Sequence, residues 1–120
     1  MKCTLQYLNG AIDDVLTLGA DDITMMTTWV DASYAVHGDM KSHTGGVISF
    51  GREGLFCKST KQKLNTKSST EAELVGASDF LPNTIWAMLF LKAQGYKMKE
   101  SKFFQDNQST MIKQTDKKAY

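Results

Sequence analysis

Three acidic residues stand at the boundaries of expected secondary-structure elements and could bind a metal ion. Asp31 and Asp106 each end an apolar, strand-like stretch, and Glu73 lies in the first turn of a helix expected between them. A carboxylate at the end of a buried strand is costly to desolvate without a partner, and a divalent cation makes several such groups compatible. Oxygen donors from separate elements suit Mg²⁺. The alternative is that each aspartate is an ordinary turn or helix-cap residue.

The strands that would carry two of these acids are expected from residue type. The stretch from Ile23 to about Asp31 is rich in β-branched and aromatic residues, and Lys102–Asp106 is a second candidate strand. Gly45–Phe50 and Leu55–Ser59 flank a short glycine-bearing loop, which predicts a β-hairpin. Val15–Gly19 is a further short, strand-like run.

A capping-box pattern predicts where the acid-bearing helix begins. Ser68 can accept a hydrogen bond from the backbone at position 71, and the Glu71 side chain can reach back. Glu71 therefore already has a structural role, whereas Glu73 has none of comparable strength. Of these two acids, Glu73 is the better functional candidate.

The rest of the helical region is expected in three pieces. Pro82 should break or kink the first helix near Leu81, because proline lacks the amide hydrogen that the helix needs. A second helix should continue through Gln94, with Gly95 at a left-handed stop. A brief helix is expected over 107–113. The element order β, β-hairpin, α, α, β, α is that of an α/β domain with a mixed sheet.

Composition restricts the function classes. The chain has 120 residues, enough for one compact domain, and a formal charge of +1, so nucleic-acid binding would need a local basic patch. No apolar run reaches the roughly 18 residues of a membrane span, and the N-terminus lacks a signal-peptide pattern. Cys3 and Cys57 are therefore expected to be free thiols.

A local basic patch is indeed present between Glu53 and Glu71, a stretch without acids. It consists of Lys58, Lys61, Lys63 and Lys67. These lysines could bind a nucleic-acid backbone in a salt-dependent way. Alternatively, they protect an exposed edge strand and the loop that follows it.

One further group of possible metal ligands is His37, Asp39 and His43. These residues could be drawn as a zinc site, but the remaining ligands of the usual zinc pattern are missing. A solvated polar loop is the favoured interpretation.

Five motifs in order resemble one known family. They are the stretches 28–35 (Thr-Trp-Val-Asp-Ala-Ser-Tyr-Ala), 42–50 (Ser-His-Thr-Gly-Gly-Val-Ile-Ser-Phe), 59–63 (Ser-Thr-Lys-Gln-Lys), 68–74 (Ser-Ser-Thr-Glu-Ala-Glu-Leu) and 104–109 (Phe-Gln-Asp-Asn-Gln-Ser). Together they resemble the ribonuclease H domain of copia-type (Pseudoviridae) LTR retrotransposon polyproteins, over roughly residues 5 to 112. The resemblance implies a ribonuclease H-like fold, in which antiparallel hairpin strands adjoin a parallel pair.

The same resemblance implies a chemistry. Asp31, Glu73 and Asp106 match the family's catalytic acids, which bind two Mg²⁺ or Mn²⁺ ions and hydrolyse the RNA strand of an RNA/DNA hybrid. Ser69, Thr70 and Gln108 match positions that contact the 2′-hydroxyl of RNA. An alternative role for each of these three is helix capping.

The resemblance also implies an organisation and partners. Residues 1–22 match the segment joining the reverse transcriptase to this domain, and 23–120 match the domain without its fourth-acid segment and closing helix. Asp116 is not in the fourth-acid motif. The leading interpretation is a ribonuclease H that acts beside a reverse transcriptase, in a cytoplasmic retrotransposon particle or in the nucleus, without a membrane. The alternative is a catalytically inactive fragment or domesticated copy that binds partners or self-associates through surface exposed by truncation.

Overall fold

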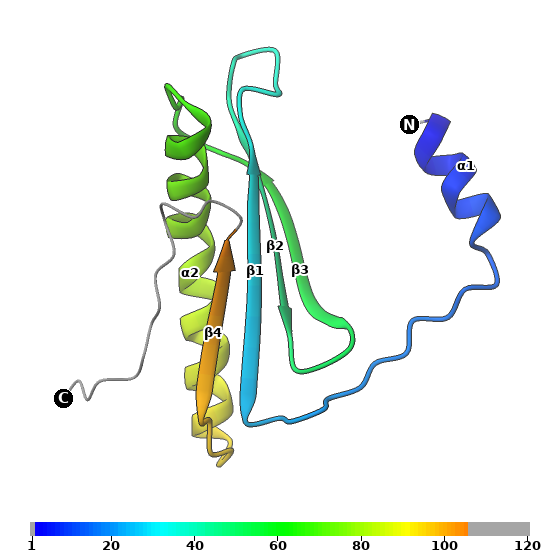
Figure 1. Ribbon diagram of the computed structural model, residues 1–120, viewed down its shortest axis with the longest axis vertical. Coiled ribbons are helices and arrows are strands. Elements are labelled where there is room, and N and C mark those ends of the chain that lie inside the picture. Colours follow the sequence, from blue (N-terminus) through cyan, green and yellow to red (C-terminus); the bar gives the residue numbers. More distant parts are fainter. Residues whose placement is uncertain (1, 106–120) are drawn as a thin grey trace.

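The computed structural model describes residues 2–105 and consists of a four-stranded mixed sheet, one long helix packed on it and a short N-terminal helix (Figure 1). In chain order the elements are α1 (Lys2–Gly10), β1 (Met25–Ser33), β2 (His43–Ser49), β3 (Gly54–Lys61), α2 (Ser69–Ala93) and β4 (Glu100–Gln105). The expected mixed α/β architecture is confirmed.

The sheet has the strand order β3-β2-β1-β4. β1 pairs antiparallel with β2, β2 pairs antiparallel with β3, and β1 pairs parallel with β4. The predicted hairpin and the strands predicted at Ile23–Asp31 and from Lys102 are confirmed with slightly shifted bounds. Because β1 and β4 are parallel, their C-terminal ends lie at the same edge of the sheet, where Val30 pairs with Gln105.

Alternation along β1 divides its side chains between two faces. Met26 and Val30 are buried and form the core with Ile48 of β2 and Phe80 of α2. Thr28, on the same face, lies 3.2 Å from Thr84 of α2 between the hydroxyl oxygens. α2 therefore covers one face of the sheet.

Helix α2 begins as predicted but continues past the proline. The Ser68 hydroxyl accepts a hydrogen bond from the Glu71 amide. The Glu71 carboxylate accepts one from the amide of Lys67, whereas in the usual capping box it would bond the amide of the N-cap residue Ser68. The prediction of two helices separated at Pro82 is wrong, because Pro82 lies inside one helix. The core contacts of Phe80 and Thr84, on either side of the proline, hold both halves against the sheet.

The end of α2 is confirmed. Gly95 has a φ of +93°, and its amide donates to the carbonyl of Lys92 while the amide of Tyr96 donates to Leu91. This is the Schellman arrangement, which favours glycine.

Helix α2 is long and apolar enough to cross a membrane by length and composition alone. Core helices of soluble proteins meet the same two criteria.

The N-terminal region differs from expectation. Residues 2–10 form α1, which buries none of its residues and stands apart from the sheet (Figure 1). The prediction of a strand at Val15–Gly19 is wrong, because this run forms no strand. A short apolar-rich run becomes a strand only when it pairs along its length, and pairing here is limited to one isolated antiparallel bridge between Ala20 and Gly51.

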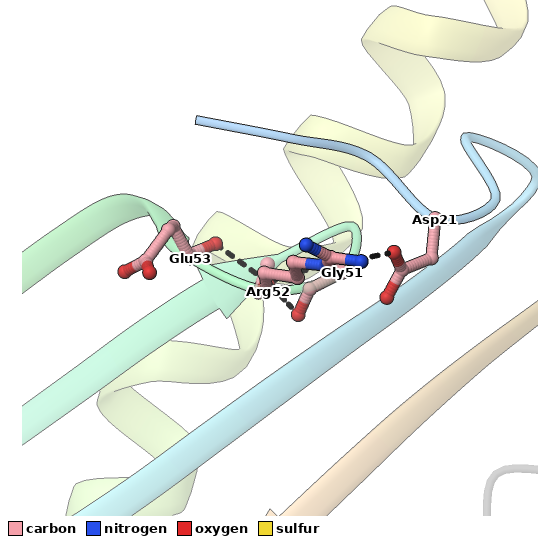
Figure 2. Close-up of polar contacts among 5 residues, drawn as sticks. Asp21, Gly51, Arg52 and Glu53 are labelled. Carbon is pink, nitrogen blue, oxygen red and sulfur yellow. Dashed lines mark hydrogen bonds and ion pairs between the residues drawn. The ribbon is translucent and has the colours of Figure 1, made fainter. Parts of the chain in front are cut away.

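The turn between β2 and β3 anchors that bridge. The Ser49 hydroxyl donates to the carbonyl of Glu53 at 2.6 Å, and Arg52 forms an exposed ion pair with Asp21 at 3.7 Å (Figure 2). An exposed pair of this kind contributes little stability. The internal hydrogen bond of Ser49, which is buried, is therefore the more important contact in the turn.

Two glycines allow α2 to lie close to the sheet. A Cβ atom added at Gly46 would overlap the ring of Phe80, and one at Gly76 would lie 3.1 Å from the Thr44 hydroxyl and 3.3 Å from the Ala32 methyl. At both positions the space between the helix and the sheet therefore has little or no room for an added methyl group.

We expect Gly46→Ala to lower the free energy of unfolding by about 1–3 kcal/mol, because the added methyl group overpacks the Phe80 ring. The neighbouring Gly45→Ala is the matched control, since a Cβ at Gly45 meets nothing within 4 Å. Urea denaturation of both variants measures the difference. Equal stability of the two variants would contradict the close approach.

Candidate functional site

The structure brings two of the three predicted acids together. The backbone amide of Ala32 lies 2.9 Å from Oδ1 of Asp31 and 3.3 Å from Oε1 of Glu73, so one N–H faces both carboxylates. Asp31 comes from β1 and Glu73 from the second turn of α2. The contact between Ala32 and Glu73 joins residues 41 positions apart in the chain.

Each acid is placed by its element. Asp31 is on the face of β1 opposite Val30, toward the side of the sheet that α2 leaves uncovered. Glu73 reaches the same edge from α2 because the helix lies close to the sheet at Gly76, one turn further on. The two carboxylates therefore meet at the edge of the sheet rather than within either face.

A third side chain, Gln105 at the end of β4, fixes the position of Glu73. The Gln105 side-chain amide donates to the backbone carbonyl of Glu73 at 2.6 Å and to its carboxylate oxygen Oε2 at 3.1 Å. Gln105 is only 7% exposed, so these bonds satisfy a buried amide. Gln105 was not among the residues predicted from the sequence. The signal in the sequence that could have identified Gln105 is its position as a polar residue directly before Asp106, at the end of an apolar strand.

The electrostatics of this pair disfavour two negative charges. Burial raises the pKa of Glu73, and the neighbouring Asp31 carboxylate raises it further, while hydrogen bonds from Gln105 and Ala32 act in the opposite direction. Like charges on adjacent carboxylates are relieved by a bound cation or by protonation.

The described donors fit part of a hard-cation site. Two carboxylates supply the oxygen ligands that Mg²⁺ prefers, and Mg²⁺ commonly binds one or two carboxylates together with waters and substrate phosphates. Within residues 2–105, no group of three or more His, Cys, Asp or Glu side chains is arranged to hold a metal ion. Asp106 lies outside the described residues, as do Gln108 and the helix expected over 107–113.

A shallow groove of about 780 Å³ runs beside Asp31 on the uncovered face of the sheet. Trp29 and Phe104 line it and stack with ring centroids 6.0 Å apart. Cys57 and Ser59 of β3, which lie in register with Trp29 and Asp31 across β2, form part of its opposite wall. The groove thus places one acid and two aromatic rings along one surface.

The other predicted substrate-binding residues lie on exposed surface. Ser69 and Thr70 are the first residues of α2 and are exposed. All four lysines of the basic patch are exposed, on the edge strand β3 and the loop after it. Lys61 forms an ion pair with Asp39 at 2.7 Å between Nζ and Oδ2, so it is engaged within the protein. The predicted edge-strand position of the lysines is confirmed, and their binding of a nucleic acid stays a prediction.

Both cysteines are free and exposed, as expected. Neither contributes to the acidic pair.

We predict that Glu73→Gln raises the melting temperature at pH 7. The folded-state pKa of Glu73 is raised, so ionisation of the side chain lowers the stability of the fold as pH rises from the ordinary glutamate pKa of 4.5 through the raised folded-state pKa, and the loss is constant above it. The gain should shrink toward zero as pH falls below 4.5. Thermal unfolding between pH 4 and 8 measures it, with Glu71→Gln as the control that lacks the gain. A gain independent of pH would contradict this electrostatic origin.

Comparison with known proteins shows similarity to a retrotransposon protein. The retrovirus-related Pol polyprotein from transposon TNT 1-94 of Nicotiana tabacum is 33% identical over 114 residues. The match covers 92% of this chain and 8% of that protein, so the chain spans a small part of its relative. No family model matches the chain, and no solved structure does. The chain is therefore homologous to a segment of a retrotransposon Pol polyprotein.

Proposed function

We propose that the chain is the ribonuclease H part of a retrotransposon Pol polyprotein and that it hydrolyses the RNA strand of RNA/DNA hybrids. The observation that carries the proposal is the meeting of Asp31 and Glu73 around the Ala32 amide. The motif resemblance assigns metal binding to these same two acids, and the homology to a Pol polyprotein agrees with the proposed origin. The ribonuclease H-like fold is part of the proposal, and the mixed sheet is consistent with it.

In the proposed mechanism, Asp31 and Glu73 hold Mg²⁺ or Mn²⁺ through carboxylate oxygens. Asp106, which directly follows Gln105 in the sequence, is the third ligand. When bound, the ions supply an activated water and stabilise the charge on the leaving oxygen. Water attacks the phosphorus, the bond to the 3′ oxygen breaks, and the products are a 3′-hydroxyl and a 5′-phosphate.

The remaining residues position the ligands and the substrate. Gln105 holds the Glu73 carboxylate toward Asp31, which reduces the reorganisation needed when a cation binds. Lys58, exposed on the edge strand β3, is proposed to contact the phosphate backbone. Ser69, Thr70 and Gln108 are proposed to contact the 2′-hydroxyl of the RNA strand. The proposed setting is beside the reverse transcriptase of the same polyprotein, in a cytoplasmic particle or the nucleus.

We predict that Asp31→Asn and Glu73→Gln each reduce Mg²⁺-dependent cleavage of a labelled RNA/DNA hybrid by more than about 100-fold. Loss of a metal ligand removes several kcal/mol of transition-state stabilisation. Glu71→Gln is the matched control, because Glu71 lies two residues away in the same helix but accepts only a capping bond. Retained cleavage in both acid variants would refute the assignment. A rise in melting temperature with Mn²⁺, present in the native chain and absent from both variants, reports the ion independently.

The lysine patch allows a second test. Replacing Lys58, Lys63 and Lys67 with glutamine should weaken hybrid binding and lower the slope of log K against log salt by about one for each phosphate that is no longer neutralised. Substituting Lys92, Lys97 and Lys99, which lie at the end of α2 and beyond it, is the charge-matched control. Fluorescence anisotropy at several salt concentrations gives both slopes. Equal slopes for the two triple variants would show that the lysine patch does not bind the hybrid and serves only to protect the edge strand.

The alternative function is a catalytically inactive chain that self-associates. The exposed Trp29 and Phe104 in the groove favour it, since these residues are 44% and 43% exposed on an uncovered sheet face. This alternative requires folded protein, no metal-dependent cleavage, and a mass that increases with concentration. Analytical ultracentrifugation alongside the cleavage assay separates the two functions.

A further inference from the structure

The loop between β1 and β2 brings together the two histidines of the chain. Nε2 of His37 lies 3.0 Å from Nδ1 of His43, six positions further along the chain. Their ring centroids are 5.2 Å apart. A solvated polar loop was expected here, and the structure shows an organised contact between that loop and the first residue of β2.

Several interactions hold His37 in this position. The amide of Met40 donates to the His37 carbonyl at 2.8 Å, and the His37 amide donates to the carbonyl of Lys41 at 3.2 Å. Ala35 and Met40 adopt positive φ values of 49° and 60°, which are uncommon for residues with side chains. The Asp39 carboxylate, also in the loop, is tied to Lys61 of β3.

The other nitrogen of His43 is also engaged. Its Nε2 lies 2.7 Å from the hydroxyl oxygen of Ser59 on β3. In the tautomer in which Nε2–H of His43 donates to Ser59, Nδ1 of His43 carries its lone pair toward His37. Metal-binding histidines are typically oriented in this manner, with the second ring nitrogen donating to an oxygen.

We propose that His37 Nε2 and His43 Nδ1 form a chelating site for a divalent transition ion of the Zn²⁺ and Cu²⁺ class. Zinc–imidazole bonds of about 2.0–2.1 Å at a tetrahedral ion place two nitrogens roughly 3.3 Å apart, a few tenths of an ångström more than the present separation. Water completes the coordination. When Nε2 of His37 binds the ion, the ring proton of His37 lies on Nδ1.

This site differs chemically from the acidic pair. Imidazole nitrogens suit Zn²⁺ and Cu²⁺, whereas Mg²⁺ prefers oxygen ligands. Asp31 nevertheless shares a face of the sheet with Ser59, the partner of His43, since Asp31 pairs with Gly45 and Gly45 pairs with Ser59. An ion on the histidines would fasten the β1–β2 loop to β2, and through Ser59 to β3, beside the groove.

The test uses untagged full-length chain carrying Cys3→Ser and Cys57→Ser, because the two exposed thiols would otherwise bind the same ions. Isothermal titration with ZnCl₂ and with CuCl₂ should show one ion per chain, with Cu²⁺ bound more tightly. His37→Gln and His43→Gln should each weaken binding by more than about tenfold, and Ser59→Ala by about tenfold. MgCl₂ at the same concentrations should not compete.

The controls separate this site from the acidic pair and from a folding defect. Asp31→Asn combined with Glu73→Gln should leave Zn²⁺ affinity unchanged, and a loss of affinity in that variant would overturn the proposal. If His43→Gln does not fold, His37→Gln decides alone, because its side chain lies in a surface loop. Absence of Zn²⁺ and Cu²⁺ binding at millimolar concentration, or affinity unaffected by His37→Gln, would show a hydrogen-bonded histidine pair only.

Discussion

The close approach of α2 to the sheet is the constraint on which the rest of the structure depends. Gly46 on β2 leaves room for the ring of Phe80, and Gly76 on the helix leaves room for Thr44 and Ala32. Buried hydrogen bonds reinforce this approach, because the Gln62 side-chain amide donates both to the Thr44 hydroxyl at 2.9 Å and to a carbonyl in the first turn of α2 at 2.8 Å. A wider separation would move Glu73 away from Asp31 and remove the site.

The site concentrates negative charge where the fold would be more stable without it. Glu73 is partly desolvated beside a second carboxylate, and Gln105 gives it only partial compensation. Binding sites for cations commonly have this character, since the ligands repel one another until the ion arrives. The same balance explains why one substitution, Glu73→Gln, is expected to affect stability and catalysis in opposite directions.

Much apolar surface in residues 2–105 remains outside the core. Trp86 is 67% exposed and stacks on Phe90 along the C-terminal half of α2, and a groove of about 690 Å³ separates this half from the β2–β3 hairpin. Trp29 and Phe104 lie on the other side of the sheet. Large exposed apolar areas are characteristic of surfaces that contact other proteins.

Local patterns in the sequence were sufficient for β1, the hairpin, β4, the start of α2 at Ser68 and its end at Gly95. Each of these depends on neighbouring residues: alternation, a short glycine-bearing turn, a capping side chain or a left-handed residue. Asp31 and Glu73 were also identified as candidates from residue type, position and motif. Tertiary structure alone decided that α2 continues through Pro82, because its contacts on both sides of the proline come from the sheet. Tertiary structure also decided that Val15–Gly19 forms no strand. The contacts of Gln105 with Glu73 and of His37 with His43 were decided in the same way. Each of these outcomes depends on packing or loop closure, which no local pattern encodes.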